Sequence, residues 1–217
     1  MNDYCMKIII YGLLIILFSA GNIHADQNDN FLKAAKEGNL NGVIEAINKG
    51  INVNTKNQYG STALILSSAH GHFEIAKLLI KNGADVNTKD NKGNTALIIP
   101  NFFGYTEIVR LLIENGADVN AKNNENYTAL IIASTMLNTE TVKLLIQNGA
   151  DVNVKTNAGY TALISACVIG NIEIVKLLIE KGADVNVKNN ENYTALKYSK
   201  KRGNTEIVKI LKTAGAK

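Results

Sequence analysis

Apolar residues recur along most of the chain at the spacing of an amphipathic helix. Residues 173–179, for example, place isoleucine, valine and leucine at helical spacing. Each such run follows a shorter apolar segment that starts at a threonine, as at Thr161, whose hydroxyl can cap a helix by accepting a free backbone N–H. A glycine such as Gly170 separates the two and allows a tight turn, and Gly182 is placed to end the second helix in a left-handed conformation. The pattern predicts helix, turn, helix and hairpin loop.

This pattern recurs along the chain at one constant interval. The tripeptide Thr-Ala-Leu begins at five positions and the pentapeptide Gly-Ala-Asp-Val-Asn at four, and the interval between consecutive copies is the same in both series. The threonines are Thr62, Thr95, Thr128, Thr161 and Thr194, and the glycines are Gly83, Gly116, Gly149 and Gly182. Many of the chain's 30 asparagines fall in the loop that this pentapeptide opens, where short polar side chains can hydrogen-bond the backbone.

The repeated unit resembles the ankyrin repeat in its length of about 33 residues, its Thr-x-Leu helix start, its mid-unit glycine, its Glu-Ile-Val-x-Leu-Leu second helix and its Gly-Ala-Asp-Val-Asn loop. The resemblance covers residues 28–217 and implies an all-α repeat solenoid of helix-turn-helix units, each followed by a β-hairpin loop. Six stacked units are expected: an N-terminal capping repeat at residues 26–57, four full repeats at 58–189 and a C-terminal capping repeat at 190–217. The family's usual Thr-Pro-Leu-His is here Thr-Ala-Leu-Ile, so the loop hydrogen bonds of that histidine are expected to be absent.

Residues 1–25 do not share the repeat and resemble a signal peptide. Residues 8–20 form an uninterrupted apolar run, which is short for a membrane-spanning helix of about 20 residues and suits the core of a signal peptide. Cleavage is expected after Gly21 or Ala25, and translation is expected to start at Met6, because Asp3 otherwise cancels the charge of Lys7. We therefore expect export to the periplasm or beyond, with no membrane anchor after cleavage. An uncleaved anchor or a buried helix is the alternative.

Composition narrows the candidate chemistry. The chain is 46% hydrophobic and 19% charged, and its net charge of +4 is far below that of a dedicated nucleic-acid binder. Two cysteines cannot form a four-thiolate zinc site, and His70 and His72 have no third ligand nearby. The repeated aspartates stand about one repeat apart, too far to share a calcium ion. The sequence has neither a catalytic triad nor a phosphate-binding loop, so we expect no enzyme activity, no cofactor and no metal. Cys167 is expected to be buried and inert, and His72 is expected to have a structural role.

Two series of charges follow the repeat. Glutamates stand three residues before a basic residue, as in Glu173 and Lys176, and predict i, i+3 pairs that contribute about 0.2–0.5 kcal/mol each on a solvated helix face. A second series has no acid built into it and runs along the loops: Lys56, Lys89, Lys122, Lys155 and Lys188. These lysines could attract an acidic partner or nucleic acid, but we favour the interpretation that they protect an exposed edge.

Sequence variation between the units concentrates just before the mid-unit glycine and just before the motif threonine. By the resemblance, these positions line the concave surface with which such solenoids bind. Apolar and aromatic residues there, followed by basic ones, predict a binding stripe for a protein partner. Its residues are Phe102, Phe103, Tyr127, Met136, Tyr160, Val168, Ile169, Tyr193, Lys201 and Arg202. For each residue, the alternative is a place in the core between neighbouring helices.

Two units break the pattern. Pro100 falls inside the first helix of its unit, where it costs about 3 kcal/mol in a regular helix, and our hypothesis is that it reshapes this helix to present Phe102 and Phe103. In the next unit Leu137 replaces the mid-unit glycine and Thr141 an isoleucine. The sequence as a whole predicts a monomeric, non-enzymatic module that binds a protein partner, rather than nucleic acid, on its concave face. The alternative is a passive structural protein of the envelope.

Overall fold

The computed structural model describes residues 27–217, so the predicted signal peptide at residues 1–25 lies outside the described part. Two compact units make up the chain, the first ending at Asp118 and the second beginning at Val119. Both units consist of helices and loops, which confirms the all-α repeat fold. Between residues 27 and 217 no helix combines the length and the apolar character needed to cross a membrane.

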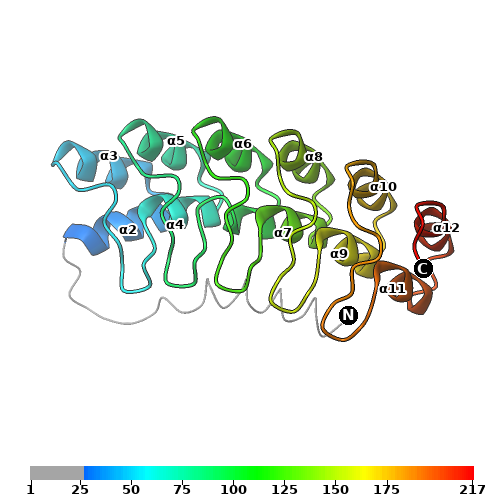
Figure 1. Ribbon diagram of the computed structural model, residues 1–217. Helices are drawn as coiled ribbons and strands as arrows, with labels where there is room; N and C mark the ends of the chain where they lie inside the picture. The colour runs from blue at the N-terminus through cyan, green and yellow to red at the C-terminus, as the bar shows by residue number, and fades with distance from the viewer. Residues whose placement is uncertain (1–26) are drawn as a thin grey trace. The chain divides into compact units, whose positions relative to one another are not determined.

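The first unit contains three helix pairs. Its first helices pack side by side in one layer and its second helices form another, while the loops project away from the pairs (Figure 1). The first helices are α2 (Gln27–Glu37), α4 (Ala63–Ala69) and the 3-10 helix η1 (Ile99–Phe102). The second helices are α3 (Leu40–Asn48), α5 (Phe73–Lys81) and α6 (Thr106–Glu114).

The second unit repeats this arrangement with three further pairs. Its first helices are α7 (Ala129–Thr135), α9 (Ala162–Ile169) and α11 (Ala195–Lys201), and its second helices are α8 (Thr139–Gln147), α10 (Ile172–Glu180) and α12 (Thr205–Thr213). Helix α9 shows why the layers form: seven of its eight residues are buried, because it packs against α7 and α11 on its two sides and against α10. Helix α10 buries only its apolar face, through Ile174, Val175 and Leu178.

The motif threonines cap the first helices as predicted. Thr161 Oγ1 accepts a hydrogen bond from the N–H of Ile164 at 3.2 Å, and Thr62, Thr128 and Thr194 make the equivalent bond. Thr95 is the exception, since its buried hydroxyl has no hydrogen-bond partner among the described residues. The repeat that contains Thr95 has no α-helix in the position of the first helix. The short 3-10 helix η1 stands in its place, with Pro100 in its first turn.

Two predictions about local structure were wrong. Pro100 does not interrupt a regular helix: at the start of η1 its missing N–H falls where a helix has no internal acceptor for it. The loops also contain no β-strands, and the described residues hold a single isolated bridge, between Lys56 and Thr62. Each loop instead contains a tight turn closed by two backbone bonds, such as those from Asp90 N to Asn94 O and from Gly93 N to Asp90 O, both at 2.9 Å.

The turn between first and second helix requires a left-handed residue. Gly170 occupies it with φ of +92°, and glycine adopts this conformation without steric cost. In the repeat before, Leu137 adopts the same region with φ of +64°, and its side chain is 52% exposed. Leu137 therefore carries local backbone strain that a glycine would not.

Candidate functional site

Polar side chains at the base of each loop fix the residue that precedes the motif threonine. Asn189 Oδ1 accepts hydrogen bonds from the N–H groups of Glu191 at 3.1 Å and Tyr193 at 2.9 Å. Asn57, Asp90 and Asn123 make the same pair of bonds, and Thr156 Oγ1 accepts from Tyr160 N at 3.1 Å. Short polar residues favour such local hydrogen bonds in turns. The bonds set the backbone position of the residue before each motif threonine, which is Tyr127, Tyr160 or Tyr193 in the second unit.

A second asparagine joins consecutive repeats, a role that was not predicted from the sequence. Asn153 donates from Nδ2 to Gly182 O at 3.1 Å and accepts at Oδ1 from Asp184 N at 2.8 Å. The side chain of its neighbour Asp151 bonds within the same loop, where Oδ1 accepts from the N–H of Asn153 at 2.8 Å. The equivalent asparagines that clamp the following repeat in the same way are Asn54, Asn87, Asn120 and Asn186.

In the first unit the predicted surface residues are Phe102 and Phe103, at the end of η1. Phe103 is 39% exposed, and its ring lies 5.7 Å from that of Tyr105, nearly parallel to it. Phe102 is half-buried. The corresponding residues at the end of α4 are the buried Ala69 and the half-buried His70, so η1 exposes more aromatic surface than its neighbour.

In the second unit two predicted surface residues are in the core. Tyr160 is 7% exposed and Val168 is 3% exposed, so both were wrongly assigned to the binding stripe. The hydroxyl of Tyr160 lies 2.7 Å from that of Tyr198 on the following first helix. Burial and this hydroxyl contact raise the pKa of Tyr160 above its ordinary value. Val168 packs inside α9 at the position where α11 has Lys201.

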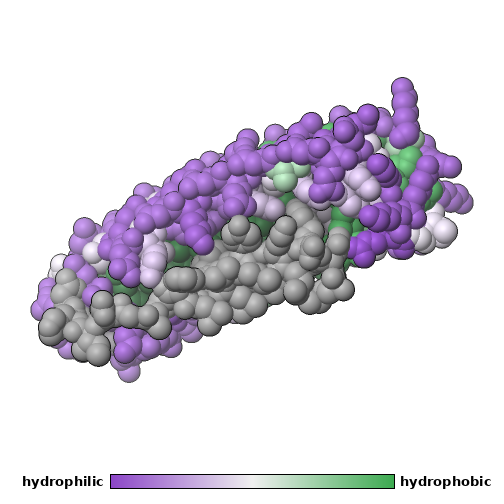
Figure 2. Space-filling model, turned by 90° about the horizontal axis from the view of Figure 1, so that it is seen from below, coloured by the Kyte–Doolittle hydropathy of each residue, from purple (hydrophilic) through white to green (hydrophobic). Residues whose placement is uncertain are grey.

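Three other predicted residues of the second unit are half-buried: Tyr127, Met136 and Ile169. Met136 ends α7 and stands beside the exposed Leu137, and Ile169 is the last residue of α9. On the face shown in Figure 2 most of the described surface is hydrophilic, and hydrophobic residues appear in small separated areas. The predicted stripe residues therefore differ in exposure, from the buried Tyr160 and Val168 to the exposed Phe103, Lys201 and Arg202.

Helix α11 and the residue before its N-cap bring aromatic and cationic side chains together. The ammonium of Lys197 lies 3.7 Å from the ring centroid of Tyr193, and that of Lys201 lies 5.5 Å from the same centroid. Tyr193 packs in turn on Tyr198, with ring centroids 5.0 Å apart. Lys201 and Arg202 are exposed as predicted, whereas the contact of Lys197 with Tyr193 was not foreseen, although their spacing of four residues places them within reach across a capped helix start.

A family model of ankyrin repeats in three copies matches four overlapping stretches of the chain, residues 31–123, 89–156, 103–189 and 130–217. The chain belongs to the ankyrin-repeat family. It is similar to an ankyrin repeat domain from Acinetobacter baumannii AYE, known from a crystal structure at 1.00 Å, with a TM-score of 0.79 and 34% sequence identity over 86% of this chain and 98% of that one. A search of curated proteins gave no significant match. Ankyrin repeats are generally protein–protein interaction modules and are typically non-enzymatic.

Two residues considered for chemistry have structural environments in this ankyrin fold. His72 Nε2 lies 2.9 Å from Lys36 O, and its ring packs so closely on Gly38 that a Cβ there would lie 2.6 Å from a ring carbon. Cys167 is fully buried as predicted, and burial raises the pKa of its thiol to about 12. Within residues 27–217 no group of three or more His, Cys, Asp or Glu side chains could hold a metal ion.

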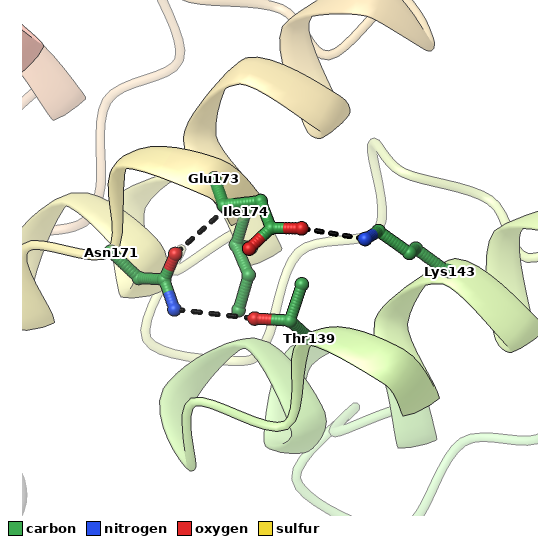
Figure 3. A network of polar contacts seen from close by, with 5 residues as sticks. All are labelled: Thr139, Lys143, Asn171, Glu173 and Ile174. Carbon is green, nitrogen blue, oxygen red and sulfur yellow. Dashed lines mark hydrogen bonds and ion pairs between the residues drawn. The ribbon is translucent and has the colours of Figure 1, made fainter.

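The charge pairs of the ankyrin helices differ from the prediction. Lys143 on α8 pairs with Glu173 on α10 at 2.5 Å (Figure 3), and Lys176 pairs with Glu206 on α12 at 3.4 Å. These pairs join neighbouring repeats, whereas the predicted i, i+3 geometry occurs between Glu107 and Arg110, at 3.8 Å. All these side chains are largely exposed, so each pair contributes at most about 1 kcal/mol.

Beside the pair of Lys143 and Glu173, Asn171 makes one hydrogen bond within its own repeat and one to the preceding repeat (Figure 3). Its Oδ1 caps α10 by accepting from Ile174 N at 3.0 Å, and its Nδ2 donates to Thr139 Oγ1 at 3.4 Å. Along the loops, Lys56 donates to Lys89 O at 3.1 Å. Polar side chains on the second helices and in the loops thus form hydrogen bonds from one repeat to the next.

Proposed function

We propose that this chain is a non-enzymatic protein-binding module whose partner contacts the exposed ends of the first helices, on the concave side of the solenoid. The observation that carries the proposal is the exposure of Phe103, which stacks on Tyr105 and leaves about two fifths of its surface to solvent. Large aromatic residues are enriched at the centres of protein interfaces. Met136 and Ile169 supply further partly exposed apolar surface at the equivalent positions of the second unit, and Tyr193 adds to it just before the first helix α11.

We propose in addition that the module is exported, by way of a signal peptide at residues 1–25. The support is the apolar run at residues 8–20, which is followed by small residues at Gly21 and Ala25. Intact mass of the chain recovered from the envelope and the culture medium tests this part. A mass that begins at Asn22 or Asp26 is expected, and a mature chain that retains Ile8 would contradict it.

A capture experiment with matched variants tests the binding proposal. The purified chain is immobilised and exposed to envelope and secreted extract, beside a Phe103→Ser variant. The control is Ile44→Ser, because Ile44 is equally exposed, at 38%, but lies on the second helix α3. Circular dichroism establishes that each bait is folded.

A protein that is retained by the wild-type chain and by Ile44→Ser, and lost with Phe103→Ser, is the expected result. Equal retention by both variants would move the binding site away from η1. Retention of no protein by any bait would favour the alternative function, a passive structural component of the envelope without a specific ligand.

A further inference from the structure

The exposed cations of α11 stand at positions that are buried and uncharged in the preceding first helix. Lys197 and Lys201 correspond to Ile164 and Val168 of α9, one repeat earlier, which are 1% and 3% exposed. An exposed helix face needs polar side chains, and serine, glutamine or glutamate would satisfy that need as well as lysine. The choice of cations at every exposed position therefore calls for a separate explanation.

The charges on α11 have no carboxylate to balance them. Lys197, Lys200, Lys201 and Arg202 are exposed and form no ion pair with any residue from 27 to 217. Three other lysines of the second unit, Lys143, Lys176 and Lys181, each pair with a glutamate. Like charges three and four residues apart on a helix repel each other. The helix C-terminus partly offsets this repulsion for Lys200 and Lys201, which lie in the last turn of α11.

The two central cations are held in place before any ligand arrives. The ammonium groups of Lys197 and Lys201 converge on the ring of Tyr193, at 3.7 and 5.5 Å from its centroid. Tyr193 rests on Tyr198, whose hydroxyl accepts from Asn189 Nδ2 at 3.0 Å. A ring anchored to this buried network restricts the lysine side chains through cation–π attraction, and that lowers the entropy lost when a ligand binds them.

We propose that this α11 cationic cluster, consisting of Tyr193, Lys197, Lys200, Lys201 and Arg202, binds an acidic segment of a protein partner. The inference rests on the proposed function and names the chemistry of the partner. Carboxylates complement the four unpaired cations. Nucleic acid is disfavoured, because single strands bind by stacking bases on exposed aromatic rings, and Tyr193 is already engaged by Lys197 and Tyr198.

The test measures binding of a fluorescent oligoglutamate peptide to the full chain by anisotropy at low salt. Tyr193→Leu leaves the net charge unchanged and should weaken binding roughly fivefold, the equivalent of losing a cation–π contact. Tyr193→Phe keeps the ring and should bind like the wild type. Lys197→Gln with Lys201→Gln should weaken binding about tenfold or more.

The matched control is Lys122→Gln with Lys155→Gln, which removes the same charge from exposed loop positions of the same unit and should change binding less than twofold. Three results would overturn the proposal: no binding of oligoglutamate by the wild-type chain, equal losses in the two double variants, or tighter binding of an oligothymidylate of equal length. None of them bears on capture through Phe103, so the proposed function is judged separately.

Discussion

Replacing Asn153 by alanine removes both hydrogen bonds by which its side chain joins two consecutive loops of the second unit. The bonds run to Gly182 O at 3.1 Å and from Asp184 N at 2.8 Å. A hydrogen bond contributes about 0.5–1.5 kcal/mol net, so the two together contribute about 1–3 kcal/mol. Gly182 and Asp184 are exposed, and water can replace the lost partner of each. We therefore expect the free energy of unfolding to fall by about 1–2 kcal/mol.

Urea unfolding and hydrogen exchange of the Asp184 amide measure this effect. Exchange is the more direct measurement, because a repeat array need not unfold in one step. A loss of about 1–2 kcal/mol corresponds to exchange roughly 5–30 times faster at Asp184. The matched control is Asn186→Ala, which removes the same bonds to Gly215 O and Lys217 N at the end of the described chain. It should cost less than about 0.5 kcal/mol, since it frees only terminal residues.

The comparison of these two variants decides whether the asparagine clamps couple repeats. Equal losses from Asn153→Ala and Asn186→Ala would refute the reasoning, because the position of the clamp within the array would then be irrelevant. Unchanged exchange at the Asp184 amide would refute it as well. Asp151→Ala, which removes only the local bond to Asn153 N at 2.8 Å, serves to separate the stiffness of one loop from the connection between two.

Three further predictions concern single buried or irregular positions. Burial raises the pKa of Cys167 to about 12. Its thiol should therefore remain unalkylated at pH 8 until the chain is unfolded, which mass spectrometry of native and unfolded samples checks. The stability that the neutral thiol contributes should be lost as pH rises towards 12. Burial lowers the pKa of His70 below 6.5, so stability should decline as pH falls through that lowered pKa, and a His70→Gln variant that declines just as steeply would contradict this origin. Pro100→Ala should weaken capture of a partner that needs Phe103, and our hypothesis for Pro100 fails if the variant gains stability and binds equally well.

Local features were predictable because the same motif recurs in successive repeats. Threonine caps, turn glycines and the amphipathic second helices depend on neighbours within one repeat. The partners of Lys143 and Lys176 were not predictable in this way. Glu173 lies three residues before Lys176, but it pairs with Lys143, 30 residues earlier. Helical spacing predicts contacts within one helix and gives no information on a partner in a neighbouring repeat. Only the offset between stacked repeats decides between them.

The candidate site shows the same limit. Tyr127, Tyr160 and Tyr193 precede three copies of one motif, and the sequence assigned all three to one surface. Tyr160 is buried because the following first helix offers Tyr198, whose hydroxyl pairs with its own. One repeat earlier that position is Ser165, whose short side chain cannot fill the same space, and Tyr127 is only half-buried. Burial of a repeated tyrosine thus depends on a residue 38 positions away.

A departure from the repeat marks a functional position only when stability does not already account for it, and Leu137 and α11 differ in this respect. Relief of the left-handed strain in Leu137→Gly is worth about 1–2 kcal/mol. Against this stand about 0.5–1 kcal/mol for the flexibility of glycine and roughly 0.7–1.5 kcal/mol for the half of the leucine surface that is buried. These contributions nearly cancel, so Leu137 is close to neutral and requires no ligand to explain it. In the α11 cationic cluster, cation–π contacts hold Lys197 and Lys201 over Tyr193, but none of its four cations pairs with a carboxylate from residue 27 to 217, and an acidic partner would supply one.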